Sequence, residues 1–164
     1  AVASLYFIDS VEWYIYNTII DGDHNGTCVT ISGGSYTKIL RGFTLQNGLG
    51  YNAGGIFIDD AEAVVENCVI KKNTGTGNQY GGGISIYEGT GTVINSMIEK
   101  NTGYNGGGIN VWYSLLSISG TTIRNNHAYG PGGGIYCGHD SWIHFDADSI
   151  SNLYINYGSP LTDF

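Results

Sequence analysis

The sequence predicts an all-β fold, a right-handed single-stranded parallel β-helix with about six turns of roughly 26 residues each. The first observation is a glycine pair followed by isoleucine, which occurs at Gly54–Ile56, Gly82–Ile84, Gly107–Ile109 and Gly133–Ile135. The four isoleucines are 28, 25 and 26 residues apart. A fixed period in this range is typical of a solenoid whose turns stack on one another.

A second repeated signal, an isoleucine three residues before an asparagine, lies between the glycine pairs. It occurs at Ile70–Asn73, Ile98–Asn101 and Ile123–Asn126. Two signals in each period fix the phase of the repeat, so equivalent residues of successive turns can be aligned. A helical solenoid is disfavoured, because no long window has an apolar stripe at a 3.6-residue period and the glycines would interrupt one.

Alternating apolar and polar residues predict short strands within each turn. After each glycine pair the first and third residues are expected to point inward and the middle one outward. The five copies of this strand are 29–31, 56–58, 84–86, 109–111 and 135–137. Two further inward columns are Leu40, Val65, Val93, Ile118 and Phe145, and Leu45, Ile70, Ile98, Ile123 and Ile150. Turns stacked at roughly 4.8 Å join these columns into one core, and the crossover rule predicts right-handed winding.

Glycine and asparagine are expected at the corners between strands. Glycine accounts for 27 of the 164 residues, and sharp corners often need the positive φ angles that glycine adopts without strain. Asparagine also tolerates the left-handed region and can hydrogen-bond the backbone or its equivalents in neighbouring turns.

The repeats predict one domain over residues 1–164. Residues 28–157 form the regular repeats and 158–164 a C-terminal tail. Residues 1–27 are an irregular first turn or cap, in which Val11–Tyr16 alternates and Ile19–Gly22 resembles a strand entering a turn. The chain begins at Ala1 without a basic or apolar leader, so we expect a mature or excised piece.

The charge of the chain excludes some partners. A net charge of −8 with only six Lys plus Arg residues argues against nucleic-acid binding through phosphates. No apolar stretch is long enough to span a membrane. Cys28, Cys68 and Cys137 fall in different columns, so we expect free, buried thiols rather than disulfides or a metal site.

The paired Gly-Gly-Ile and Ile-x-x-Asn signals resemble the GGA(I/L/V) and FxxN motifs of the polymorphic outer-membrane proteins. More broadly, they are similar to pectin-lyase-like parallel β-helix repeats of bacterial surface proteins. The resemblance covers roughly residues 28–157, although this chain has Gly or Ile where Ala or Phe is expected. It implies a secreted, extracellular or cell-surface module that is often adhesive and often part of a longer protein.

The same resemblance brings an enzymatic alternative, a polysaccharide lyase or glycoside hydrolase acting on an acidic glycan. Such hydrolases carry Asn-x-Asp, Asp-Asp, Gly-His-Gly and Arg-x-Lys motifs, of which Asp59-Asp60 is present and Gly138–Asp140 is half a match. Lyases need an Arg or Lys base beside calcium-binding carboxylates, and Arg41 and Arg124 do not fall beside the acidic positions. The sequence therefore favours a non-catalytic protein and indicates no catalytic residue.

Outward aromatic and acidic residues near the glycine-pair strand form a candidate ligand-binding surface. Asp59, Tyr87 and Trp112 align in one column, and the next column continues to Tyr113 and His139. Aromatic faces can stack on sugar rings while carboxylates bind hydroxyl groups. The predicted ligand-binding residues are Phe57, Asp59, Tyr87, Trp112, Tyr113 and Tyr136. The alternative is that these aromatics only pack on one another along the outside of the sheet.

Two acidic residues in adjacent turns indicate a candidate Ca²⁺ site. Asp60 and Glu88 would lie roughly 5 Å apart, which is costly unless one is protonated or a cation lies between them. Asp59 and Glu62 are nearby and would add oxygen ligands of the kind that calcium prefers. The alternative is a pair of solvated carboxylates that point apart.

These observations lead to one expected function and a structural alternative. We expect a module that binds carbohydrate or a partner on a cell surface, as in adhesion. The ends of a β-helix present unpaired strand edges, and neither residues 1–10 nor residues 161–164 read as a helical cap. End-to-end association into filaments is therefore the structural alternative.

Overall fold

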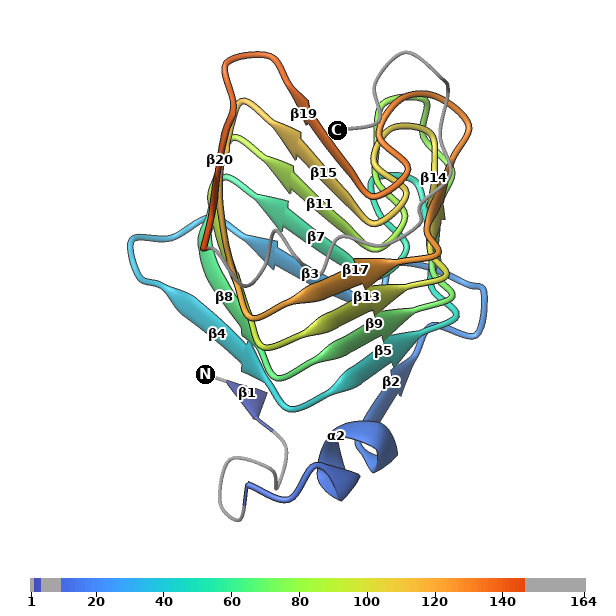
Figure 1. The fold of residues 1–164 in the computed structure, drawn as a ribbon, viewed down its shortest axis with the longest axis vertical. Helices are drawn as coiled ribbons and strands as arrows, with labels where there is room; N and C mark the ends of the chain where they lie inside the picture. Colours follow the sequence, from blue (N-terminus) through green and yellow to red (C-terminus); the bar gives the residue numbers. More distant parts are fainter. Residues whose placement is uncertain (1, 4–9, 147–164) are drawn as a thin grey trace.

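The computed structural model describes residues 2–3 and 10–146, in which the chain forms a parallel β-solenoid of about five turns. Each full turn contributes one strand to each of four parallel sheets, which surround a single core (Figure 1). We number the sheets 1 to 4 in the order in which the chain passes through them. The all-β parallel solenoid predicted from the repeats is confirmed.

Sheets 1 and 2 carry the longer strands. Sheet 1 consists of β3 (Val29–Ser32), β7 (Ile56–Asp59), β11 (Ile84–Tyr87), β15 (Ile109–Trp112) and β19 (Ile135–Gly138). Sheet 2 consists of β1 (Val2–Ala3), β4 (Lys38–Arg41), β8 (Glu62–Glu66), β12 (Thr90–Ile94), β16 (Leu115–Ser119) and β20 (Trp142–Phe145).

Sheets 3 and 4 complete the turn with shorter strands. Sheet 3 consists of β2 (Ile19–Asp21), β5 (Thr44–Gln46), β9 (Val69–Lys71), β13 (Met97–Glu99) and β17 (Thr122–Arg124). Sheet 4 consists of β6 (Leu49–Gly50), β10 (Thr74–Gly75), β14 (Thr102–Gly103) and β18 (His127–Ala128).

The register of the sheets confirms the predicted inward columns. Leu40, Val65, Val93, Ile118 and Phe145 pair in succession across sheet 2. Leu45, Ile70, Ile98 and Ile123 pair in the same way across sheet 3, while Ile150 lies outside the described residues. The first and third residues after the glycine pairs at 54, 82 and 107 are fully buried, but the middle residues Phe57, Ser85 and Asn110, which were expected to point outward, are buried as well. One core cluster joins the columns from sheets 1, 2 and 3.

The glycine pairs have a different role from the one predicted. Gly55, Gly83 and Gly108 are not among the residues with positive φ. Instead, a Cβ atom on Gly83 would lie 2.6 Å from the carbonyl oxygen of Gly108 and 2.9 Å from Asn101 Nδ2. These glycines are therefore required because backbones of successive turns approach each other closely.

The predicted asparagine column is an internal hydrogen-bond ladder. Asn73, Asn101 and Asn126 are fully buried where sheet 3 passes into sheet 4. Asn73 Nδ2 donates to Asn101 Oδ1 at 3.1 Å, and Asn101 Nδ2 donates to Asn126 Oδ1 at 3.1 Å. Each side chain also donates to a backbone carbonyl, for Asn101 that of Ile70 at 2.9 Å. The ladder thus satisfies the polar groups that the corner buries.

The start of the chain departs from the expected alternation. Helix α2 (Trp13–Asn17) occupies most of the 11–16 stretch, and only its Ile15 is buried. Figure 1 shows α2 at one end of the solenoid, beside β2. The carbonyl of Ile15 accepts a hydrogen bond from Thr44 Oγ1 at 2.8 Å, which ties the helix to β5. Among the described residues, no helix is long and apolar enough to cross a membrane.

Candidate functional site at the corner between sheets 1 and 2

The corner where sheet 1 passes into sheet 2 brings the predicted columns together. Tyr87 pairs in register with Asp59 on one side and Trp112 on the other. Asp60, Glu88, Tyr113 and His139 follow as a second column, with φ angles between 40° and 51°. The amide of Glu88 donates to the carbonyl of Trp112 at 3.2 Å, and that of Tyr113 to His139 at 3.0 Å. The left-handed backbone of this column thus turns four successive side chains outward at one corner.

Aromatic rings from three turns contact one another at this corner. The Trp112 ring centroid lies 4.3 Å from that of His139, 6.0 Å from Tyr136 and 6.2 Å from Tyr113. Tyr113 is also 5.5 Å from His139 and 6.3 Å from Tyr87. We call these five rings, Tyr87, Trp112, Tyr113, Tyr136 and His139, the aromatic cluster.

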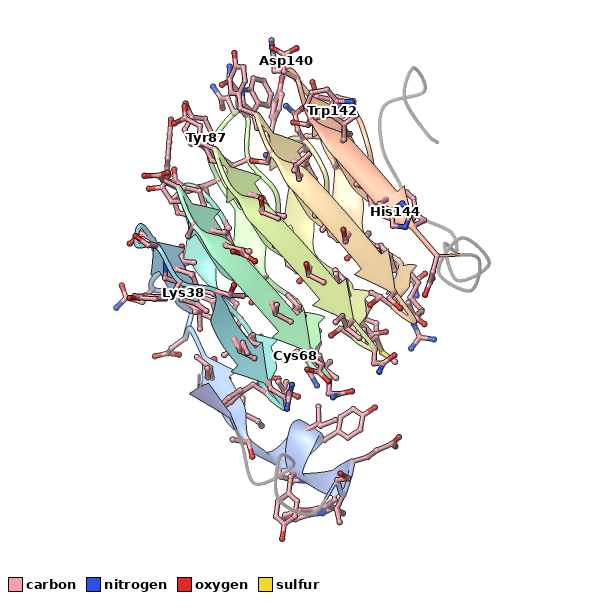
Figure 2. The ribbon with its side chains drawn as sticks, turned by 90° about the vertical axis from the view of Figure 1, so that its left-hand side faces the viewer. Lys38, Cys68, Tyr87, Asp140, Trp142 and His144 are labelled. Atoms are coloured by element: carbon pink, nitrogen blue, oxygen red, sulfur yellow. The ribbon has the colours of Figure 1, made fainter. Side chains whose placement is uncertain are left out.

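A groove runs beside the aromatic cluster, along the N-terminal ends of the strands of sheet 2. It has a cavity volume of about 430 Å³. Aromatic side chains of Tyr113 and Trp142 line it, with exposed fractions of 45% and 66%. Figure 2 shows Tyr87, Asp140 and Trp142 near the N-terminal ends of the sheet 2 strands and Cys68 near their C-terminal ends. The acidic residues that line the groove are Asp60, Glu62, Glu88 and Asp140.

Small residues form the floor of this groove. Ala61, Gly89 and Ser114 occupy equivalent places in successive turns and all line the groove. The amide of Gly89 donates to Ser114 Oγ at 3.0 Å, and the amide of Ser114 donates to Ser141 Oγ at 3.1 Å. The two serine hydroxyls thus satisfy backbone amides of the preceding turn, and the small side chains at these positions leave room for the groove.

The charges at the groove are strongly unbalanced. Among the described residues, those that line it include four acids and no Lys, Arg or His. The Glu88 carboxylate, which hydrogen-bonds the Tyr87 hydroxyl and repels a phenolate, raises the pKa of Tyr87. The ammonium group of Lys38 donates to the carbonyls of Gly33 and Gly34, and Gly34 lines one end of the groove.

The two arginines lie away from this groove, but each pairs in register with a glutamate, although neither was expected beside an acidic position. Arg41 forms an ion pair with Glu66, at the end of sheet 2 strands opposite the groove. Arg124 forms an ion pair with Glu99 at 2.9 Å in sheet 3. Neither lines the groove, so neither guanidinium group can act there as the base that a lyase would need.

Four of the six predicted ligand-binding residues meet in the aromatic cluster: Tyr87, Trp112, Tyr113 and Tyr136. Asp59 shares the column of Tyr87 and Trp112. Phe57 is different, because only 8% of its side chain is exposed and its ring packs edge-on against Tyr80 at 6.1 Å. Phe57 therefore presents no free aromatic face to a ligand.

The four predicted calcium ligands lie at or beside this groove. Asp60, Glu62 and Glu88 line the same groove, and Asp59 lies beside them in sequence. Within residues 2–3 and 10–146, no group of three or more His, Cys, Asp or Glu side chains is arranged to hold a metal ion. Calcium binding by these carboxylates therefore remains a prediction.

Trp142 and Asp140 belong to the groove but were not among the predicted ligand-binding residues. The segment between sheets 1 and 2 has five residues in the first turn, two in each of the next three turns and three in the last, residues 139–141. This extra residue hides the alignment of Trp142 with Leu115, which the structure shows. Side chains alternate along a strand, and Phe145 points inward, so the alternation would have placed Trp142, three residues earlier, on the outer face.

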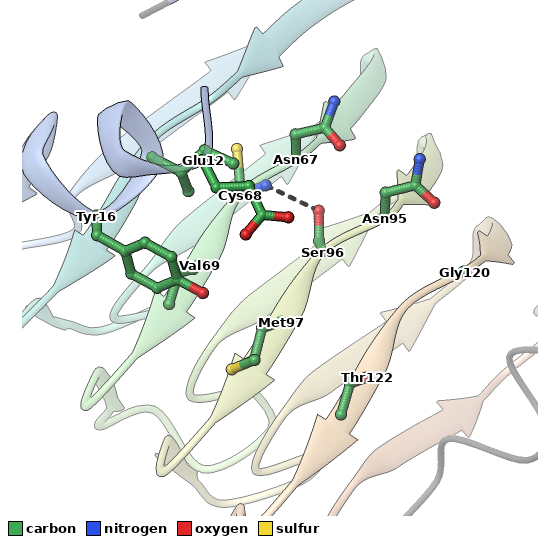
Figure 3. Close-up of a pocket in the computed structure, with 11 residues that line it drawn as sticks. Glu12, Tyr16, Asn67, Cys68, Val69, Asn95, Ser96, Met97, Gly120 and Thr122 are labelled. Carbon is green, nitrogen blue, oxygen red and sulfur yellow. Dashed lines mark hydrogen bonds between the residues drawn. The ribbon is translucent and has the colours of Figure 1, made fainter. Parts of the chain in front are cut away.

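A second groove lies between α2 and sheet 3, with a cavity volume of about 420 Å³ (Figure 3). Glu12 and Tyr16 of the helical segment face Cys68, Ser96 and Met97 across it. The Cys68 amide donates to Ser96 Oγ at 3.1 Å, which Figure 3 marks. The sequence did not predict this groove because the helix itself was not predicted.

The cysteines are free thiols, as expected, but they differ in burial. Cys68 is buried, Cys28 is partly buried and Cys137 is exposed. Burial raises the pKa of the Cys68 thiol to about 11. Cys137 is aligned with the buried Val111 of the preceding turn. Cys137 itself is exposed, and its strand β19 is the last described strand of sheet 1.

Comparison with models of known protein families, with curated proteins and with solved structures gives no match. The functional interpretation therefore depends on the geometry and chemistry of the groove between sheets 1 and 2.

Proposed function

We propose that this chain is a non-catalytic extracellular or cell-surface module that binds carbohydrate through the groove between sheets 1 and 2. The observation that carries this proposal is the aromatic cluster beside a groove of about 430 Å³. A right-handed winding belongs to the same proposal, since crossovers between parallel strands are right-handed in nearly all proteins.

The chemistry of the groove fits a sugar ligand. Ligand sites commonly combine aromatic surface with a few polar groups that fix the ligand's orientation. Tyr113 and Trp142 expose ring surface on which the C–H face of a pyranose can stack, while Glu88 and Asp140 offer acceptors for sugar hydroxyls. The lining residues come from several successive turns, so the groove follows the stacking direction of the solenoid, which suits an extended oligosaccharide.

The proposed location follows from the sequence rather than from the site. The Gly-Gly-Ile and Ile-x-x-Asn signals resemble repeats of bacterial surface proteins, and an adhesive role follows from that resemblance. The absence of Lys and Arg from the groove lining supports a binding role over a lyase role.

A glycan-array screen tests the proposal, followed by isothermal titration calorimetry with the best oligosaccharide. Trp142→Ala removes an exposed ring that lines the groove, and we expect it to weaken binding by about tenfold or more. Trp13→Ala is the matched control, because Trp13 is 62% exposed on α2. It should leave the affinity unchanged.

Three results would contradict the proposal. Equal affinities of the wild type and a folded Trp142→Ala variant would exclude the groove between sheets 1 and 2 as the binding surface. An array without any hit would exclude carbohydrate binding. Shortened or unsaturated products from a bound oligosaccharide would replace the non-catalytic role by an enzymatic one.

A further inference from the structure

The lining of the groove between sheets 1 and 2 carries information about the charge of its ligand. Four carboxyl side chains line it, from Asp60, Glu62, Glu88 and Asp140. Neutral sugars need hydrogen-bond partners but do not require an excess of one charge. An acidic sugar would meet repulsion from each of these groups.

Basic side chains are concentrated elsewhere on the molecule. The chain has six Lys and Arg residues in all. Lys71, Lys72, Lys100 and Arg124 lie in sheet 3 or at its corner with sheet 4, away from the groove lining. Arg41 pairs with Glu66, and Lys38 binds backbone carbonyls at the end of the groove. The carboxylates of the groove are therefore not neutralised by the protein's own cations along most of its length.

The aromatic rings supply an observation independent of the acids. The exposed Tyr113 and Trp142 side chains line the groove together with Glu88 and Asp140. A cation near the face of a tryptophan or tyrosine ring is attracted by the negative face of the ring, and the attraction is stronger where water is excluded. A carboxylate beside the same cation adds a charge-assisted hydrogen bond. Rings and acids together favour a positively charged group over a neutral one.

We propose that the ligand of this groove is a cationic glycan, an oligosaccharide whose sugar residues carry free amino groups. This inference rests on the proposed carbohydrate-binding function and specifies its substrate class. The sugar rings stack on Tyr113 and Trp142, and the protonated amines bind the carboxylates of Asp60, Glu88 and Asp140. The net charge of −8 attracts such a ligand at long range.

The test compares two oligosaccharides of the same length and linkage. A hexamer of β-1,4-linked glucosamine carries amines, and its fully N-acetylated counterpart is neutral. Affinities are measured by calorimetry at about pH 6, where a large share of these amines is protonated. We expect the amino hexamer to bind about tenfold more tightly at about 0.05 M salt. The ratio should fall at about 0.5 M salt, because added ions screen the charges.

Charge-matched variants separate the groove from the overall charge of the protein. Asp60→Asn with Glu88→Gln removes two charges from the groove and should reduce the preference for the amino hexamer at least about fivefold. Asparagine tolerates the φ of 47° at position 60. The control, Glu12→Gln with Asp23→Asn, changes the net charge equally at positions that do not line the groove. It should retain the preference.

The outcomes distinguish this inference from the function on which it rests. Equal binding of both hexamers would overturn the cationic ligand and leave the carbohydrate site intact. Preference for the amino hexamer that drops equally in both double variants would overturn it too, because bulk charge would then explain the preference. Binding of neither hexamer, together with a blank array, would overturn the proposed function itself.

Discussion

The ring of Tyr136 lies across Gly138, since a Cβ atom on Gly138 would come within 2.6 Å of Tyr136 Cε1 and 2.7 Å of its hydroxyl oxygen. Gly138 pairs in register with Trp112, in the column that also holds Tyr87 and Asp59. Because position 138 has no side chain, the Tyr136 ring occupies this space and lies 6.0 Å from Trp112. The glycine thus helps to complete the aromatic cluster.

Gly138→Ala should displace the Tyr136 ring and weaken oligosaccharide binding about threefold, because the new methyl group occupies the space of the ring. The atoms it would meet are the far end of a side chain, so the free energy of unfolding should change by less than about 1 kcal/mol. Calorimetry of binding and urea unfolding check both parts. An unchanged affinity would mean that Tyr136 takes no part in the site.

The repeat period and the alternation within each turn were sufficient to predict the fold. Residues such as Ile56, Ile84 and Ile109 recur at one place in each turn, and their burial follows from the stacking of strands. The cause of the glycine pairs could not be predicted, because it depends on distances between successive turns. At three corners, residues other than glycine adopt positive φ: Glu88 between sheets 1 and 2, Asn67 between sheets 2 and 3, and Lys100 between sheets 3 and 4.

Gly83→Ala tests this role of the glycine pairs. The added Cβ would lie 2.6 Å from the Gly108 carbonyl oxygen. This oxygen belongs to the backbone of the next turn, so the contact can be relieved only if the two turns move apart. We expect a loss of about 3 kcal/mol in the free energy of unfolding. Gly91→Ala is the control, because its Cβ meets the terminal Cδ1 of Ile86, which can rotate away. Similar urea midpoints for the two variants would contradict the close-approach explanation.

Asn101→Ala should destabilise the solenoid by about 3 kcal/mol or more. The substitution leaves the Asn73 amide and the Ile70 carbonyl without their partners in a fully buried position. Asn78→Ala, at an exposed site, should change the free energy of unfolding by less than about 0.5 kcal/mol. Chemical denaturation of both variants makes the comparison. A tolerated Asn101→Ala substitution would show that water or rearrangement can replace the ladder.

The candidate site was only partly predictable from the sequence. Column alignment placed Tyr87, Trp112 and Tyr113 together, because equivalent residues of a solenoid become neighbours. The burial of Phe57 could not be predicted from the sequence, because it depends on how the Tyr80 ring packs against Phe57. Trp142 was missed because residues 139–141 make the last turn one residue longer at this corner. Irregular segments of this kind carry no periodic signal.

The alkaline stability of the protein should depend on Cys68. Burial raises the pKa of this thiol from 9.0 to about 11 in the folded state. The unfolded chain therefore loses the proton at lower pH than the folded one, so stability is retained below about pH 9 and falls as the pH rises toward 11. The expected loss from this group is about 2 kcal/mol at about pH 10.5.

Urea unfolding of the wild type and Cys68→Ala under reducing conditions, at about pH 8 and about pH 10.5, isolates this contribution from that of other titrating groups. The free energy of unfolding should fall more steeply with pH in the wild type than in the variant. Tyrosines and lysines titrate in both proteins, so their effects cancel in the difference. Parallel pH dependences would mean that the Cys68 thiolate is solvated in the folded protein, which its 1% exposure argues against.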